Sequence, residues 1–471
     1  MKLRPQEKST KQAPPLRANA APAANPLPTT RPWEALYGGL FGLWLGLALL
    51  KFGNPVVLAH KIETPSDLLQ FLINPWPLAW GSLLMLPLMA VALFHRQWPR
   101  GAPVWVLALP AVWFAFQVVA AGHSIDSAMS TRTVVHFLSV VVAFYLGLVV
   151  FAGLREVHWF WALLLGAFSL VLLIGWHQHF IGLEETRRYF EVYERPKFTN
   201  GPPPELLQKL ASNRIYSTLF YPNTLAAVVL MMSPLLLTKI YLLEGITRPA
   251  KRVLLAIASL GAVMCLLWSG SKAGWLIALV MLAVGLLRFP APRRLKLTAV
   301  SVLCVVGIGL FLWRNSAYLE KGATSATARL DYWRAAVRAL SEQPIHGYGP
   351  GTFKKTYERL KPVKAEMSWL THNDYLEQAS DSGFPGFLTY SLFIGASIWL
   401  LYRKSLSNPL QFAGWVSILG MALHGLVEFN LYVPAVAWPQ FFLLGWLWGR
   451  SGQVPASPAS CGLGDLANSA D

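Results

Sequence analysis

Apolar residues in this chain fall into long uninterrupted blocks separated by short polar segments. Ile73 to Phe94, Val104 to Ala121, Val134 to Phe151 and Trp159 to Ile181 each approach the roughly 20 residues that a helix needs to cross a bilayer. A backbone inside lipid must satisfy its own hydrogen bonds, so blocks of this length are expected to be helices. The pattern therefore predicts an all-α polytopic membrane protein.

Extending this criterion along the chain predicts about twelve transmembrane helices. Their expected positions are residues 34–52, 73–94, 103–121, 133–152, 158–181, 218–243, 253–270, 273–288, 296–313, 384–402, 411–428 and 433–449.

Composition agrees with a membrane protein, because 54% of the residues are hydrophobic and 13% are charged, whereas soluble domains carry roughly 25% charged residues. The net charge of +17 does not indicate a nucleic-acid partner, since the basic residues lie between apolar blocks and form no continuous face. Cys265 and Cys304 lie within apolar blocks and Cys461 lies near the C-terminus, so neither a disulfide framework nor a metal cluster is expected.

The chain divides into five expected regions. Residues 1–32 are rich in Pro, Ala and basic residues, and residues 451–471 are small and polar; both are expected to be disordered cytoplasmic tails. Residues 33–313 carry the first nine spans and an outer loop, 182–217. Residues 314–383 form a large outer loop, and residues 384–450 carry the last three spans.

Orientation follows from the basic residues of the short loops. With a cytoplasmic N-terminus, the inner loops are basic, whereas the outer short loops contain only Lys51 and Lys61, then Arg132, then Lys272. The excess of Lys and Arg on the inner side predicts that both termini are cytoplasmic and that loops 182–217 and 314–383 face outward. The segments richest in polar chemistry then share the outer face, where ATP is absent, so a substrate must bring its own activation.

The loop 314–383 begins with a predicted amphipathic helix. Leu330, Trp333, Val337 and Leu340 recur at helical spacing, and the helix is expected to end before Pro344. Arg334 and Arg338 lie on another face, where they could contact lipid phosphates or contribute to a site.

Arg329 is expected at the start of this helix, where a bound anion would relieve the conflict between a cation and the helix dipole. The glycine-rich segment from His346 to Thr352 lacks the spacing and the Lys of a P-loop, so we interpret it as a structural turn.

Candidate chemistry lies where polar residues meet the expected membrane surface. His372 is followed by Asn373 and Asp374 close to an apolar span, and polar groups there are costly unless they serve a function. A histidine is suited to take up a proton near neutral pH, which makes His372 the candidate base.

Other candidate residues lie near the ends of predicted spans. Lys272 lies in a Ser-Gly-Ser-Lys turn between two spans, where a cation needs an anion or must extend to lipid headgroups. Arg214 precedes Asn223, which begins a span. His424 and Glu428 are expected one turn apart on a helix, either as a structural pair or facing the site. No Asp-x-Asp pair or His/Cys cluster is evident, so neither a metal nor another cofactor is predicted.

Four stretches together resemble the O-antigen ligase and polymerase superfamily of bacterial envelope glycosyltransferases. They are Arg214 through Asn223 to Ala226; Ser269 to Gly274; Arg329 through Trp333 to Gly351; and His372-Asn373 followed by Gly383 and Gly386. The segment from His424 to Asn430 also matches a common variant ending, so the resemblance covers roughly residues 210–450.

This resemblance implies a GT-C-like fold, in which a helical periplasmic loop covers a site at the outer face of the inner membrane. It implies transfer of a glycan from a polyprenyl-diphosphate carrier, such as undecaprenyl diphosphate, to a hydroxyl of a glycolipid, glycan or protein, without a metal. His372 would then be the catalytic base, and Arg214, Lys272 and Arg329 would hold the diphosphate. Lys272 departs from the family, which usually has Arg there, and Lys lacks the two-pronged fork that suits phosphate.

Alternative functions remain open from the sequence. Ligase, polymerase and protein glycosyl ligase share these motifs, and the glycine spacing after His372 favours a ligase. A polytopic transporter or flippase would have a similar number of spans, but it should show internal repeats and charges near the middle of the membrane. A non-catalytic scaffold would not explain Arg, Lys and His side chains on one face.

Overall fold

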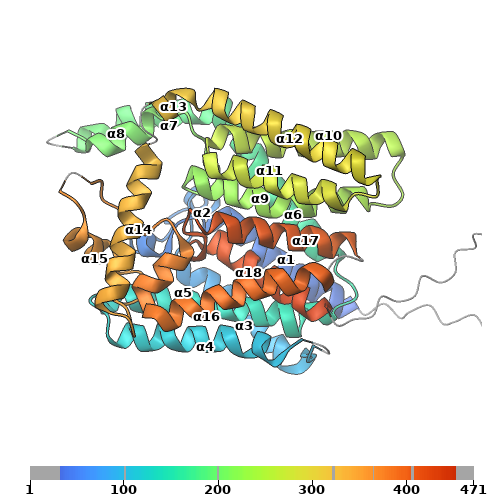
Figure 1. The fold of residues 1–471 in the computed structure, drawn as a ribbon, viewed down its shortest axis with the longest axis horizontal. Coiled ribbons are helices and arrows are strands. Elements are labelled where there is room, and N and C mark those ends of the chain that lie inside the picture. The colour runs from blue at the N-terminus through green and yellow to red at the C-terminus, as the bar shows by residue number, and fades with distance from the viewer. Residues whose placement is uncertain are drawn as a thin grey trace, which may run out of the picture.

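The computed structural model describes six stretches of the chain, namely residues 32–99, 102–198, 201–320, 324–363, 365–404 and 408–451. Within these stretches the secondary structure is helical and contains no strand, which confirms the predicted all-α fold class (Figure 1). The expected disordered tails lie outside the described residues, apart from Pro32 and Ser451 at their inner edges.

Every predicted span coincides with a long helix. These helices are α1 (Pro32–Lys51), α3 (Leu78–His95), α4 (Val104–Gly122), α5 (Ser127–Val149), α6 (His158–His177), α9 (Pro222–Tyr241), α10 (Arg248–Ser269), α11 (Lys272–Arg288), α12 (Arg293–Arg314), α16 (Asp374–Lys404), α17 (Pro409–His424) and α18 (Pro434–Arg450).

Of the helices in the described residues, nine are long and apolar enough to cross a membrane. The other three predicted spans, α11, α17 and α18, are helices of 17, 16 and 17 residues. The polytopic character is therefore confirmed, while the count of twelve crossings stays a prediction.

Shorter elements connect the long helices. They are η1 (Val56–Lys61), α2 (Leu68–Ile73), η2 (Phe151–Gly153), η3 (Gln178–Gly182), α7 (Leu183–Tyr189), η4 (Phe190–Glu194), η5 (Arg195–Lys197), α8 (Pro204–Ala211), α13 (Ser316–Glu320), α14 (Thr324–Glu342), α15 (Phe353–Leu360) and η6 (Asn430–Tyr432).

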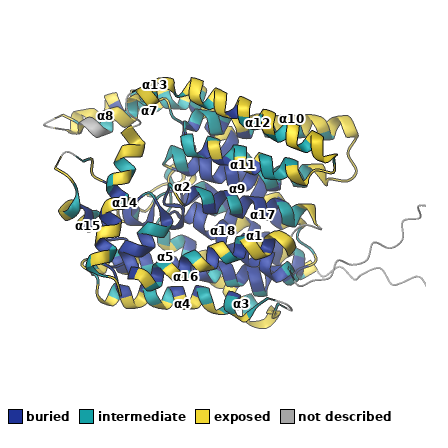
Figure 2. Ribbon diagram, viewed as in Figure 1, coloured by how far each residue is buried: buried dark blue, intermediate teal, exposed yellow. Residues whose placement is uncertain are grey.

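Helix α18 forms the centre of the bundle. Every residue from Pro434 to Gly449 is buried (Figure 2), as expected for a helix that is apolar on all sides. Helix α12, in contrast, buries only Gly307 and presents apolar side chains such as Val305 and Leu312 outward. An exposed apolar surface of this kind is stable against lipid tails, which agrees with a membrane location.

Close contact between α18 and α5 depends on small residues. A Cβ atom added at Gly147 of α5 would collide with the backbone carbonyl of Phe442, and one added at Gly445 of α18 would collide with the carbonyl of Phe144. Without side chains at these positions the two backbones touch directly, which maximises van der Waals contact between helices in lipid.

The two ends of the bundle differ in structure. At one end, the backbone N–H of Arg155 donates to Glu34 at 3.0 Å, and Arg450 donates to the carbonyl of Leu154 at 2.7 Å. These bonds bring the start of α1, the α5–α6 connection and the end of α18 together. Helices α7, α8, α13, α14 and α15 lie at the opposite end (Figure 1). All predicted site residues lie in segments at this second end.

Helix α16 bends at Ser382 and Gly383, where the backbone leaves the helical conformation. Gly383 has a φ of 67°, and a Cβ atom there would lie 2.6 Å from the carbonyl oxygen of Pro344. The bend coincides with the position where the sequence predicts the outer loop 314–383 to end. The part of α16 before the bend contains buried polar residues, including Glu377, Gln378 and Asp381.

Helix α14 contains the predicted amphipathic helix, and its apolar stripe is not its buried face. The helix buries Tyr332, Ala335, Ala336 and Ala339, whereas Leu330 and Val337 are exposed. The periodicity of Leu330 and Val337 therefore marks an outward apolar stripe, which suits a helix lying at a lipid surface.

The glycine-rich segment 346–352 is structural, as expected. Gly347, Gly349 and Gly351 have φ angles of 63°, 103° and 76°, values that favour glycine. The backbone N–H groups of Tyr348 and Gly349 donate to the carbonyls of Ser380 and Asp381 at 2.9 and 3.0 Å. The turn therefore anchors the outer loop to α16.

Replacing Gly445 by Ala is expected to destabilise the protein, because the added methyl group meets the backbone of α5 and cannot be accommodated by side-chain movement. Overpacking of this kind costs about 1–3 kcal/mol. The thermal midpoint of the detergent-purified variant should fall by several degrees. The matched control is Gly395→Ala in α16, where the added Cβ has no neighbour within 4 Å. An equal midpoint for both variants would contradict the packing described here.

Candidate functional site

The carboxylate of Glu428 lies at the centre of a polar network at the outer-loop end of the bundle. Helix α17 ends at His424, and Glu428 follows in a turn, so the predicted span 411–428 is too long and His424 and Glu428 do not share a helix. The side chain of Glu428 is only 5% exposed. A carboxylate this buried requires several hydrogen-bond donors to stay ionised.

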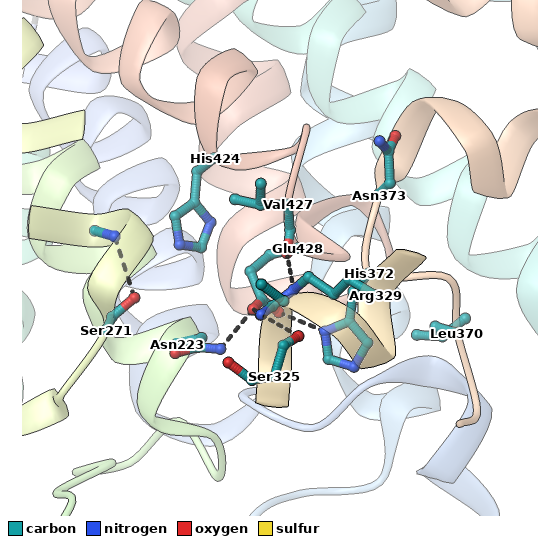
Figure 3. A network of polar contacts seen from close by, with 12 residues as sticks. Asn223, Ser271, Ser325, Arg329, Leu370, His372, Asn373, His424, Val427 and Glu428 are labelled. Carbon is teal, nitrogen blue, oxygen red and sulfur yellow. Dashed lines mark hydrogen bonds and ion pairs between the residues drawn. The ribbon is translucent and has the colours of Figure 1, made fainter. Parts of the chain in front are cut away.

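Three side chains from distant segments donate to Glu428 (Figure 3). Arg329 of α14 forms an ion pair with Oε1. Asn223, at the start of α9, donates to Oε1 from Nδ2 at 2.5 Å. His372, just before α16, places Nδ1 3.0 Å from Oε2. Glu428 therefore joins α9, α14, the start of α16 and the end of α17.

The charge of Glu428 is maintained by its surroundings. Burial alone would raise the pKa of this carboxyl, but the hydrogen bond and charge of His372 together with the charge of Arg329 lower the pKa to about 2. Glu428 is therefore an anion throughout the physiological pH range.

This anion determines the orientation of His372. An ionised carboxylate can only accept hydrogen bonds, so Nδ1 of His372 must carry the hydrogen that lies between them. In the neutral imidazole, Nε2 then has a free lone pair, and no described residue forms a hydrogen bond with Nε2. The side chain is 27% exposed. Such a tautomer would leave Nε2 of His372 free to accept a proton.

Aromatic rings and an unusual backbone conformation also hold His372. The ring of Phe429 lies 4.8 Å from the imidazole centroid and that of Tyr332 lies 5.8 Å away. The φ angle of His372 is 54°, a conformation that costs non-glycine residues energy and is concentrated at functional sites.

Arg329 is brought to the site as predicted, but not from the start of a helix. Helix α14 begins at Thr324, so Arg329 lies in its second turn, and the predicted conflict with the helix dipole is wrong. Its guanidinium is fixed by Glu428, by the carbonyl of Val427 at 3.1 Å and by that of Ser325 at 3.2 Å. The side chain of Arg329 is 20% exposed, so part of it remains accessible.

Arg214 reaches the same network from the loop before α9. Its Nη2 donates to Asn223 at 2.6 Å, and its Nε donates to the carbonyl of Ser269 at 2.7 Å. Gly270, with a φ of 62°, passes beside this guanidinium, and a Cβ there would lie 3.1 Å from Nε. Burial lowers the pKa of Arg214, while the charge of Glu428 opposes this effect.

The predicted Ser-Gly-Ser-Lys turn therefore packs against Arg214 and leads to Lys272. Lys272 is the first residue of α11, and Ser271 caps the helix by accepting the N–H of Gly274 at 3.2 Å. The ammonium of Lys272 lies 4.0 Å from the ring centroid of Tyr318 in α13. In the described residues Lys272 has no carboxylate partner.

The remaining predicted residues have structural roles in the network. Asn373 accepts the N–H groups of Tyr375 and Leu376 at 3.0 Å and donates to the carbonyl of Leu426 at 2.9 Å. Asp374 accepts the N–H of Leu431 at 3.0 Å. His424 is fully buried and contacts Asn430 at 2.9 Å. These bonds fix the backbone of the turn that carries Glu428.

One positioning residue has no signal in the motifs. Arg187 of α7 donates to the carbonyl of Leu210 at 2.9 Å, to that of Ser212 at 3.2 Å and to Asn213 Oδ1 at 2.6 Å. These bonds hold the segment that leads into Arg214. The segment around it, Glu184 to Arg188, shows only the mixed charge of an ordinary polar helix.

The site carries an excess of positive charge. Arg214 and Arg329 lie near the carboxylate of Glu428, and Lys272 lies within electrostatic reach of both arginines. One carboxylate can balance only one of these three cations. Cations that are partly removed from water repel one another unless an anion is bound. An anionic ligand would balance this excess of positive charge. Among the described residues no group of three or more His, Cys, Asp or Glu is arranged to hold a metal ion.

Long apolar helices that bring a histidine and a cluster of cations together at one end are an arrangement expected of a membrane enzyme. Residues 255–391 match the family described as O-antigen ligase. This stretch contains Lys272, Arg329 and His372, whereas Arg214 and Glu428 lie outside it. This match confirms the resemblance to the O-antigen ligase and polymerase superfamily that the sequence predicts.

A protein of Haemophilus influenzae described as uncharacterized is 27% identical over 191 residues, which cover 35% of this chain and 47% of that protein. The chain thus spans about half the length of this relative.

The low pKa of Glu428 predicts a specific pH dependence of stability. A carboxyl whose pKa falls from 4.5 to about 2 on folding stabilises the protein fully above pH 4.5, and this stabilisation is lost as the pH falls toward 2. Its size is of the order of 3 kcal/mol. Glu428→Gln should therefore lower the thermal midpoint at pH 7, with the gap to wild type narrowing below pH 4.5.

The control for this experiment is Glu184→Gln, because the side chain of Glu184 is 79% exposed and should change the midpoint little at any pH. A gap between wild type and Glu428→Gln that stays constant from pH 7 to pH 3 would show that Glu428 is not the ionised centre of the network.

Proposed function

We propose that this protein is an O-antigen ligase-type glycosyltransferase that moves a glycan from a polyprenyl-diphosphate carrier to an acceptor hydroxyl. The observation that carries the proposal is the contact between Glu428 and Nδ1 of His372, since it leaves Nε2 free as a base beside three cations. The family match over residues 255–391 supports the same chemistry.

The proposed reaction is a single displacement. The acceptor oxygen attacks the anomeric carbon of the glycan while Nε2 of His372 takes the hydroxyl proton, and the bond between that carbon and the diphosphate oxygen breaks. The departing diphosphate carries the electron pair, and Arg214, Lys272 and Arg329 stabilise its charge. Preorganised cations in a site that excludes much of the water are the largest source of such stabilisation.

Each of the other residues has a defined part in this scheme. Glu428 is a positioning residue that orients His372 and stabilises the imidazolium formed on proton transfer. Asn223 links Glu428 to Arg214 and so couples the base to the diphosphate-binding cations. We place the diphosphate against Arg214 and Lys272, where α11 also begins, because helix N-termini favour anions.

We further propose that the protein adopts a GT-C-like arrangement in the bacterial inner membrane, with both termini cytoplasmic and the site at the periplasmic face. The separation of the outer-loop helices from the end joined by Glu34, Arg155 and Arg450 supports this orientation. The isoprenoid of the carrier would stay in lipid beside the apolar surfaces of the bundle, and its head would reach the network at the end of the helices.

Replacing His372 by Gln is expected to reduce glycan transfer by about 10²–10⁴-fold, which is the usual contribution of a general base. The test is complementation of a strain that lacks the gene, with surface glycan and lipid-linked precursor measured and membrane insertion verified. The matched control is His346→Gln, because His346 lies in the same loop and contacts the carbonyl of Gly347 and the ring of His123.

Accumulated precursor with no attached glycan would identify a ligase, whereas attached single repeat units would identify a polymerase. Normal glycan in the His372→Gln strain would reject His372 as the base and would favour the transporter reading.

Removing the charge of Lys272 should weaken binding of the donor more than it slows the chemical step. Lys272→Ala is expected to raise the KM for the lipid-linked donor about tenfold, equivalent to about 1.4 kcal/mol. Lys272→Arg should restore binding, because its forked guanidinium suits phosphate. Transfer assays with reconstituted protein would check this; an unchanged KM for Lys272→Ala would remove Lys272 from the diphosphate site.

A further inference from the structure

A cavity lies at the same end of the bundle, outside the network around Glu428. Its volume is about 320 Å³, near the lower limit of the roughly 300–1,000 Å³ typical of small-molecule pockets. The wall is formed by η1, the first turns of α5, the start of α15 and the segment before His372. The lining includes His60, Asp126, Arg132, Lys354, Lys355, Glu358 and Trp369.

Trp369 supplies an apolar surface in this cavity. Its indole is half-buried, and the ammonium groups of Lys354 and Lys61 lie 4.1 and 5.7 Å from a ring centroid of the indole. The imidazole of His60 is 6.3 Å from the same residue's ring. An aromatic face bordered by cations provides contact area for an apolar surface and charge for an anion at its edge.

The charges of the cavity are only partly balanced. Asp126 is already engaged, because it caps α5 by accepting the N–H of Met129 at 3.1 Å and pairs with Lys355 at 2.9 Å. Glu358 is the other carboxylate in the lining. Arg132 and Lys354 form no ion pair with a described carboxylate, so the cavity retains positive charge that an anionic ligand would match.

Two basic residues at this cavity, Lys61 and Arg132, come from parts of the sequence where few basic residues are expected. Short outer loops are expected to contain few basic residues, and those of this chain are Lys51, Lys61, Arg132 and Lys272. Lys51 donates hydrogen bonds to the carbonyls of Leu72 and Asn74 at the C-terminal end of α2. Lys272 lies in the site already described. Lys61 belongs to η1 and Arg132 to α5, and both reach this cavity or its tryptophan.

We propose that this cavity binds an acidic sugar of the acceptor, with the sugar ring against Trp369 and its carboxylate held by Arg132 and Lys354. The assignment to the acceptor rests on the function proposed above. It follows from connectivity: Trp369 lies three residues before His372 on one segment, whereas the cavity lining includes neither Arg214 nor Lys272. A displacement requires the acceptor on the side of the base and the diphosphate on the other side.

The test is ligand-observed NMR on the full chain in nanodiscs of phosphatidylcholine, using methyl β-glucuronide and methyl β-glucoside as probes. The two sugars differ only in the carboxylate, so the glucuronide should bind at least about tenfold more tightly, which corresponds to about 1.4 kcal/mol. Arg132→Gln should remove this preference, while Arg334→Gln, a control on the exposed face of α14, should keep it.

Equal binding of the two sugars, or a preference that survives Arg132→Gln, would overturn the proposal without requiring any variant to be fully stable. Displacement of the glucuronide by phosphatidylglycerol in the nanodisc would assign the cavity to a lipid headgroup and would also overturn it. His372→Gln should reduce transfer by about 10²–10⁴-fold but leave glucuronide binding unchanged. If the rate of transfer in that variant equals the wild-type rate, the function proposed above fails, whatever the binding data show.

Discussion

The buried carboxylate of Glu428 is the interaction on which the arrangement of the site depends. Without it, Arg329 and Arg214 would be cations near one another with only neutral partners, and His372 would have no group to fix its tautomer. A buried ion pair contributes little net stability by itself, because desolvation offsets most of the attraction. Its effect here is geometric: because four segments meet at one carboxylate, the carboxylate fixes how they are arranged.

The fold was largely predictable from the sequence because lipid imposes a simple requirement on the backbone. Each predicted apolar block contains a helix, since no other local structure satisfies its hydrogen bonds in a bilayer. The buried face of α14 was not predictable in the same way. In a soluble protein the apolar stripe of a helix faces the core, but at a membrane surface Leu330 and Val337 can face lipid while small residues such as Ala336 pack inward. Hydrophobic periodicity then no longer indicates which side is buried.

The sequence was sufficient to name most residues of the candidate site, but not to recognise that Glu428 lies at its centre. Arg214, Lys272, Arg329 and His372 could be found because their motifs place them near the ends of spans. The central role of Glu428 could not, because it depends on contacts with residues 56 and 99 positions away in the sequence. The assumption that 411–428 forms one helix also concealed it, since Glu428 reaches the network only because α17 stops at His424. The turn after His424 is held by bonds from Asn373 and Asp374, which sequence spacing does not reveal.

His372 lies along the chain between two groups of residues for which different roles are proposed. On one side, Glu428 fixes Nδ1 and connects through Asn223 to the cations proposed to hold the diphosphate. On the other side, the chain leads back to Trp369, which lines the cavity described above. A sugar bound there would lie close along the chain to the base, so binding energy from a non-reacting part of the acceptor could orient its hydroxyl, which is how remote contacts accelerate a reaction. Selectivity would then depend on the cavity and reactivity on the network, and substitutions could change one without the other.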